Sequence, residues 1–173
     1  LGTSNLADES VFERWSRVVS DPEFPARVDV SYGSVPNFPL PSAGRDEAAQ
    51  RFVEMRSRST DKLTVGRVKL VADGSIQGFS ARLRWPGYYN GAPNGLWYTP
   101  PEQLREAYQL ALARGVQVHT HTNGDEATEL VLDCIEEALQ KHPARDHRFS
   151  LQHCQLADAA QFLHESVRRS KDD

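Results

Sequence analysis

The chain has 173 residues, of which 39% are hydrophobic and 25% are charged, and its formal net charge is −4. This length and composition are typical of one globular domain with a sizeable core. Basic side chains are interspersed with acidic ones, as in residues 45–62, so we expect no cationic surface for a phosphate backbone and no nucleic-acid partner.

The sequence also predicts no membrane segment, because no apolar run approaches the roughly 20 residues that a span needs. The first ten residues, LGTSNLADES, lack the basic and apolar regions of a signal peptide. Two cysteines, Cys134 and Cys154, form no close-spaced pair, as is typical of a reduced compartment. We therefore expect a cytoplasmic protein. The start without Met and the charged stretch 162–173 lead us to expect that both ends are cut.

The predicted elements alternate along the chain. An acidic start and helical spacing of apolar residues predict a helix over 8–19, followed by a strand over 25–32. A loop rich in Pro and Gly, 33–44, leads to a second helix over 45–59. The β-branched run 65–71 then predicts a buried strand that ends in a turn at Asp73.

The second half continues the alternation after a long aromatic stretch, 76–98, whose length indicates a functional loop. Thr99 as N-cap, Glu102 three residues later and Gly115 beyond the end predict a helix over 99–115. Further elements are predicted as a strand at 116–121, a helix at 125–142, a strand at 147–156 and a helix opening at Asp158.

Such alternation indicates an α/β protein with a parallel sheet and flanking helices. Four strands in this order fit either a small doubly wound sheet or part of a (β/α)8 TIM barrel. Periodicity does not choose between these two folds.

Polar residues end three successive predicted strands: Lys69 with Asp73, His119 with His121, and His153. Loops after parallel strands line one common mouth, so these side chains are candidates for one site. A single histidine at a strand end is more often a hydrogen-bonded structural residue than a ligand. Here, however, three successive strands end in groups that can bind a metal or transfer a proton. A shared metal or catalytic site is therefore as well supported as a purely structural role for these residues.

Lys69 lies between Val68 and Leu70 in a predicted buried strand. Burial would lower the pKa of its amine, and a neutral amine can act as a nucleophile or react with carbon dioxide to form a carbamate. The alternative is an edge strand on which Lys69 points to solvent.

Three blocks in order, VKLVADGSIQGFSA (68–81), GVQVHTHTNGDEATELVLD (115–133) and RFSLQHCQL (148–156), resemble the amidohydrolase superfamily, and specifically its YtcJ-like branch of metal-dependent hydrolases with the N-substituted formamide deformylases. The resemblance is strong over about 60–160. It implies that residues 1–173 are a single segment of a (β/α)8 barrel, about strands three to six.

By this resemblance Lys69 is similar to a lysine that is carbamylated to bridge two metals, and His121 and His153 are similar to imidazole ligands. The implied cofactor is a divalent metal, zinc before iron, manganese or nickel, as one or two ions. Asp73 is expected to hold the substrate or a group near the metal. The implied reaction is hydrolysis of C–N bonds, in amides, formamides or cyclic amides, by metal-activated water.

The chain also departs from the family pattern. The His-x-His of the first strand and the Asp after the eighth strand lie outside this sequence, and Gln152 stands where the family has Glu. His119 and His121 are two apart in a strand and could both reach one ion, but the family has one ligand there. We therefore interpret His121 as the ligand and His119 as a residue of the layer below.

The aromatic loop predicts substrate contacts by Arg82, Trp85, Tyr88 and Trp97, with packing on the barrel rim as the alternative. Asp125 is interpreted as a helix cap rather than a site residue.

We expect a hydrolase of small amide-type substrates that self-associates, as a homo-oligomer, through unpaired barrel edges. The alternatives are a catalytically incomplete fragment or non-catalytic small-molecule-binding descendant of the fold, and a Schiff-base enzyme built on Lys69.

Overall fold

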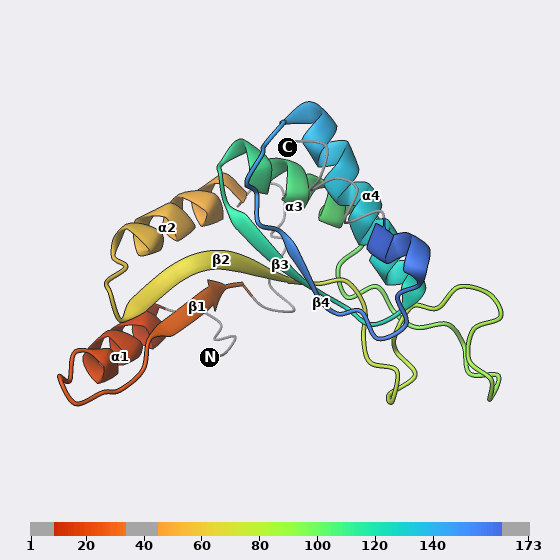
Figure 1. The fold of residues 1–173 in the computed structure, drawn as a ribbon, viewed down its shortest axis with the longest axis horizontal. Coiled ribbons are helices and arrows are strands. Elements are labelled where there is room, and N and C mark those ends of the chain that lie inside the picture. Colours follow the sequence, from red (N-terminus) through yellow and green to blue (C-terminus); the bar gives the residue numbers. More distant parts are fainter. Residues whose placement is uncertain (1–8, 34–44, 164–173) are drawn as a thin grey trace. The chain divides into compact units, whose positions relative to one another are not determined.

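The computed structural model describes residues 9–33 and 45–163, which divide into two compact units, 1–69 and 70–173. The elements alternate as predicted (Figure 1). Their bounds are α1 Glu9–Val19, β1 Val28–Tyr32, α2 Arg45–Ser57, β2 Leu63–Val71, α3 Pro101–Ala113, β3 Gln117–Thr122, α4 Asp125–Lys141 and β4 Ser150–His153. A short helix at 159–163 ends the described part.

In the first unit, β1 and β2 pair in parallel, with a register shift between Val30 and Ser31. The apolar side chains of these strands are buried together with residues of both helices. The rings of Tyr32 and Phe52 meet edge to face at 5.9 Å, which packs α2 against β1. Apart from Gly33, the predicted loop 33–44 lies outside the described residues.

In the second unit, the chain continues from the end of β2, where the Ala72 N–H donates to the His121 carbonyl of β3 at 3.0 Å. β3 and β4 pair in parallel, and the strand order of the sheet follows the sequence, β1-β2-β3-β4. The predicted parallel α/β arrangement with flanking helices is therefore confirmed.

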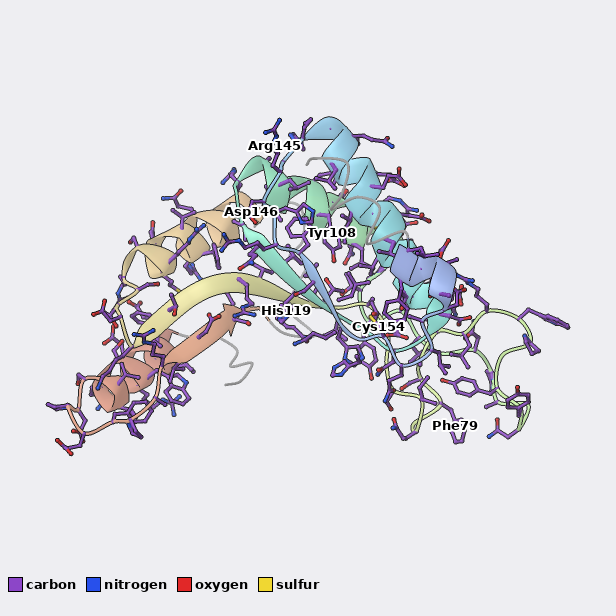
Figure 2. All side chains as sticks on the ribbon, viewed as in Figure 1. Phe79, Tyr108, His119, Arg145, Asp146 and Cys154 are labelled. Carbon is purple, nitrogen blue, oxygen red and sulfur yellow. The ribbon has the colours of Figure 1, made fainter. Side chains whose placement is uncertain are left out.

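Helices α3 and α4 pack against each other in the second unit (Figure 1). Tyr108 of α3 is fully buried, contacts the Phe149 ring at 5.2 Å and shares a 2.5 Å hydrogen bond with the Thr120 hydroxyl. Along β3, Val118, Thr120 and Thr122 are buried, whereas the residues between them are partly exposed. Figure 2 shows Tyr108 on the helical side of β3 and His119 on the opposite side. The alternation thus divides β3 into a face packed on helices and a face with the histidines.

The predicted N-cap of α3 is wrong. Thr99 does not cap α3: its hydroxyl donates to the Val71 carbonyl at 2.7 Å, and Pro100 occupies the N-cap position without a side-chain cap bond. Thr99 is almost completely buried, so its hydroxyl bonds the adjacent strand end instead. Gly115 does follow the helix in the left-handed region, with φ 60°, as predicted.

Candidate functional site

A buried carboxylate, Asp73, organises the loop end of the second unit. Its side chain is 0% exposed. Oδ1 accepts the Asn123 N–H at 2.9 Å, and Oδ2 accepts the Gly124 N–H at 2.8 Å and the Arg82 N–H at 3.0 Å. Three backbone donors satisfy the two oxygens of this buried side chain. Asp73 therefore joins the loop after β2 to the turn after β3.

His121 lies beside this carboxylate at the end of β3. Its Nε2 is 2.9 Å from the Gly74 carbonyl oxygen and 3.8 Å from Asp73 Oδ1, and its side chain is 20% exposed. A carbonyl oxygen can only accept, so the 2.9 Å contact requires the proton on Nε2. Asn123 Nδ2 lies 3.2 Å from the same nitrogen, but an unprotonated Nε2 would place its lone pair against that of the Gly74 oxygen, so the ring and the amide are two donors to one carbonyl. Asn123 Nδ2 donates to the same carbonyl at 2.7 Å. The lone pair of the neutral His121 ring is therefore on Nδ1, the nitrogen available to a metal.

His153 reaches the same place by a local change of backbone conformation. Its Cα pairs with Thr122, a residue of the buried helical face, so regular alternation would direct both side chains to that face. Instead His153 has φ 74° and Cys154 has φ 45°. The His153 and His121 rings lie edge to face with their centroids 4.8 Å apart. Left-handed backbone at non-glycine residues is uncommon and concentrates at functional sites.

Lys69 belongs to the first unit. It is 8% exposed in β2, and this burial lowers the pKa of its amine to about 8. At neutral pH a larger fraction of such an amine is unprotonated than of an ordinary lysine. The predicted solvent-pointing alternative is wrong, because the side chain is buried.

The donor set suits a divalent metal only in part. The two neighbouring imidazoles are good ligands for zinc. Across 9–33 and 45–163, however, no group of three or more His, Cys, Asp or Glu side chains is arranged to hold a metal ion. The residues thus fit two positions of a coordination shell and require further ligands.

Two further residues are secondary candidates for the site, His119 in β3 and Asp125 in α4. His119 is partly exposed on the same face of β3 as His121, two residues earlier. Asp125 is the first residue of α4, with Gly124 as N-cap, and its Oδ1 accepts the N–H groups of Glu126 and Arg84, both at 3.0 Å. The prediction that Asp125 caps the helix is therefore wrong: it is the first helical residue, and its carboxylate binds the next N–H and the N–H of Arg84 in the loop.

The predicted substrate residue Arg82 is engaged within the loop. Its guanidinium pairs with Glu126 at 2.7 Å, donates to the Gly95 carbonyl at 3.0 Å and lies over the Trp97 ring at 4.9 Å. Asn94 donates to the other Glu126 oxygen at 2.8 Å. These contacts attach the aromatic loop to the first turn of α4.

The outer part of the loop is more exposed. Tyr88 donates its hydroxyl to the Ala81 carbonyl at 3.0 Å and meets the Phe79 ring at 5.4 Å. Trp85 is 93% exposed. Figure 2 shows Phe79 far out on the loop, away from α3 and α4. The four predicted substrate residues therefore differ. Arg82 and Tyr88 are hydrogen-bonded within the loop, Trp97 lies under the Arg82 guanidinium, and Trp85 projects into solvent.

Sequence reasoning missed Gly74 and Asn123. A hydrogen bond to a backbone carbonyl leaves no signal in the sequence. The glycine at position 74 is nevertheless required for steric reasons, since a Cβ there would collide with Ser80. Asn123 directly follows β3, where a polar residue at a strand end could have been added to the candidates.

Comparison with known proteins identifies the family of the chain. A model of the Amidohydrolase family (Amidohydro_3) matches residues 5–169. The chain belongs to the amidohydrolase family, and its parallel strands with flanking helices form part of that family's barrel fold.

Among curated proteins, the chain is 33% identical over 113 residues to the putative amidohydrolase YtcJ of Bacillus subtilis, covering 65% of this chain and 21% of that protein. It is 35% identical over 94 residues to the protein LONG AFTER FAR-RED 3 of Arabidopsis thaliana, covering 54% of this chain and 16% of that protein. The chain thus spans about a fifth of the length of these relatives.

A solved structure of an uncharacterized metal-dependent hydrolase from Pyrococcus horikoshii has the same fold. It superposes with a TM-score of 0.69 at 19% identity, over 96% of this chain and 31% of that chain.

In the described ranges, none of the helices is long and apolar enough to cross a membrane.

Proposed function

We propose that the protein is a metal-dependent hydrolase that cleaves C–N bonds other than peptide bonds, in amides, formamides or cyclic amides. The observation that carries the proposal is the pair His121 and His153, whose ring centroids are 4.8 Å apart at the ends of two adjacent parallel strands. Catalytic groups of (β/α)8 barrels lie at this edge of the sheet.

Membership of the amidohydrolase family supports the reaction class. The similar fold of the metal-dependent hydrolase from Pyrococcus horikoshii supports the requirement for a metal. His121 and His153 would each supply one imidazole nitrogen, Nδ1 in the case of His121, because its Nε2 proton is held by the Gly74 carbonyl.

Lys69 is proposed as a further ligand in its carbamate form. A pKa of about 8 leaves part of the amine unprotonated at neutral pH, which is the form that reacts with carbon dioxide. Zinc is the proposed ion, as one or two per protein, because imidazole nitrogens and an anionic oxygen suit it. When bound, such an ion lowers the pKa of a coordinated water and polarises a carbonyl.

The other residues bind and position. Asp73 keeps its carboxylate buried on three backbone donors and so maintains the turn that follows His121. The aromatic loop, fastened to α4 through Arg82 and Glu126, provides an apolar wall suited to an aromatic or alkyl amide. The proposed substrates are therefore small N-acyl or N-formyl amines.

The test combines metal analysis with an activity screen. The purified natural full-length protein is loaded with zinc in the presence of bicarbonate, its bound metal is measured by mass spectrometry, and hydrolysis of N-formyl and N-acyl amines is followed. The proposal predicts stoichiometric zinc and amine release that a chelator abolishes. Failure to retain metal after loading would overturn it and favour a non-catalytic, small-molecule-binding descendant of the fold.

A Schiff-base reaction at Lys69 makes a different prediction. Borohydride would then trap a carbonyl substrate on the protein, and chelation would leave the activity unchanged.

A further inference from the structure

The loop after β2 and the turn after β3 are linked through one side chain. Asp73 accepts the N–H of Arg82 from the loop, and the N–H groups of Asn123 and Gly124 from the turn. A Cβ at Gly124 would collide with the Arg82 carbonyl, so the two segments are in direct backbone contact at this point. Asp73 is 0% exposed. The carboxylate thus satisfies three backbone donors where the two segments meet.

The same junction determines the direction of the Gly74 carbonyl. Gly74 donates its own N–H to the Ser80 carbonyl at 3.1 Å, and Ser75 N–H donates to the Ser80 hydroxyl at 3.0 Å. These bonds close a tight loop directly after Asp73. The Gly74 oxygen then points to His121 Nε2 at 2.9 Å and to Asn123 Nδ2 at 2.7 Å.

We infer that Asp73 is the positioning residue of His121: through the backbone of Gly74 and Asn123 it holds the ring in the Nε2–H tautomer, with Nδ1 as the lone-pair nitrogen. Both Asp73 oxygens accept backbone N–H groups and Oδ1 is 3.8 Å from His121 Nε2, beyond hydrogen-bond distance, so Asp73 acts on the ring through the backbone. The consequence for metal binding rests on the proposed function, whereas the tautomer is a property of the metal-free protein.

The conservative variant is Asp73→Asn, which keeps the size of the side chain but replaces one acceptor oxygen with an NH2 group. Whichever way the amide is turned, the NH2 faces at least one backbone N–H, so one end of the junction loses its acceptor. The loss is expected to shift Gly74, the residue next to Asp73, relative to the turn after β3, although its own bonds to Ser80 remain, and His121 is then expected to populate both neutral tautomers.

Two matched variants separate positioning from general destabilisation. Tyr108→Phe removes the buried hydrogen bond to Thr120 on the other face of β3 and leaves the junction intact. Asn123→Ala keeps the backbone N–H that Asp73 accepts but removes the side-chain amide, which lies 3.2 Å from His121 Nε2 and also donates to the Gly74 carbonyl, so that this carbonyl is left to the His121 ring. Both are expected to keep the wild-type tautomer of His121.

The readout is a two-bond ¹⁵N–¹H correlation spectrum of the histidine rings, recorded on the metal-free full-length protein at mildly alkaline pH, where imidazoles are neutral. The wild type, Tyr108→Phe and Asn123→Ala are expected to show the Nε2–H pattern for His121, and Asp73→Asn a mixture. In zinc titrations, Asp73→Asn is expected to weaken binding by about 10- to 100-fold, the usual effect of losing a group that orients a ligand.

A wild-type tautomer in a folded Asp73→Asn protein would overturn the inference, as would a wild-type protein with the proton on Nδ1. If Asp73→Asn does not fold, hydrogen exchange of the wild type decides: the Asn123, Gly124 and Arg82 amides must be protected together, and rapid exchange of these three contradicts the inference. A protein with the expected tautomers that binds no zinc would refute the proposed function and leave the positioning role intact.

Discussion

The imidazole rings of His121 and His153 lie edge to face, with centroids 4.8 Å apart, although their strand positions do not form a paired register. His121 pairs with Gln152, and His153 pairs with Thr122. The left-handed backbone of His153 brings the second ring to the first.

This relationship predicts unequal effects of histidine substitutions in β3. His121→Ala removes the ring whose Nδ1 is available and is expected to reduce bound zinc to less than half of the wild-type content, as is His153→Ala. His119→Ala, on the same face but two residues earlier, is expected to spare it. Mass spectrometry of the zinc-loaded proteins measures the difference. Equal loss in His119→Ala and His121→Ala would instead indicate a paired ligand motif.

Lys69 predicts a pH-dependent contribution to stability. Burial lowers its pKa in the folded protein to about 8, from 10.5, so the charged amine is disfavoured by folding. Between pH 8 and 10.5 the unfolded chain binds more protons at this site, and the free energy of unfolding rises with pH in that window. Below pH 8 the charged Lys69 amine lowers the free energy of unfolding by about 3 kcal/mol relative to a neutral amine at the same position.

The matched variant is Lys69→Met, which is apolar and of similar length. It is expected to be more stable than the wild type in metal-free urea unfolding at pH 7, with the difference shrinking toward pH 10. An equal difference at both pH values would show that Lys69 keeps an ordinary pKa in the fold.

Tyr108 predicts a stability effect that is separate from the site. Tyr108→Phe leaves the Thr120 hydroxyl without its partner in a buried position and is expected to lower the free energy of unfolding by about 1–2 kcal/mol. Adding Thr120→Val removes the orphaned hydroxyl and should recover part of that loss. Zinc content is expected to be unchanged in both proteins, and denaturant unfolding with parallel metal analysis checks this.

The contacts of Arg82 are expected to protect the aromatic loop, residues 76–98, from proteolysis. Arg82→Ala removes the ion pair to Glu126 and the contact with the Trp97 ring, and it is expected to speed proteolytic cleavage within 76–98 several-fold. Arg84→Ala is the control, because its pairs with Glu129 and Asp158 are more exposed and contribute less. If Arg82 serves only to bind a substrate carboxylate, its substitution will raise KM for acidic amides without changing cleavage of the loop.

The sheet edges predict self-association of the isolated 173-residue chain. β4 pairs with β3 along one side, and within residues 70–163 no strand pairs with its other side. Unpaired edges recruit further strands. Light scattering after size exclusion is expected to show dimers or larger species that separate on dilution or in mild denaturant. A monodisperse monomer at high concentration contradicts this.

Much of the fold and part of the site could be predicted from the sequence, because the signals involved are local. Apolar spacing located the helices and strands, and chain order placed Lys69, His121 and His153 at or near the ends of successive strands. The wrong cap at Thr99 shows the limit of such signals: a hydroxyl before a proline pair suits a cap, but packing on the end of β2 gives it the Val71 carbonyl instead.

The sequence by itself determined the family, the alternating elements and the candidate ligands, since periodicity and motifs act over a few residues. Only the tertiary structure decided which nitrogen of His121 carries the proton, where the His153 ring points and that Arg82 holds a loop. These depend on partners such as Gly74 and Glu126, more than 40 residues away in the chain, whose hydrogen bonds form only when the strand ends and loops are packed together.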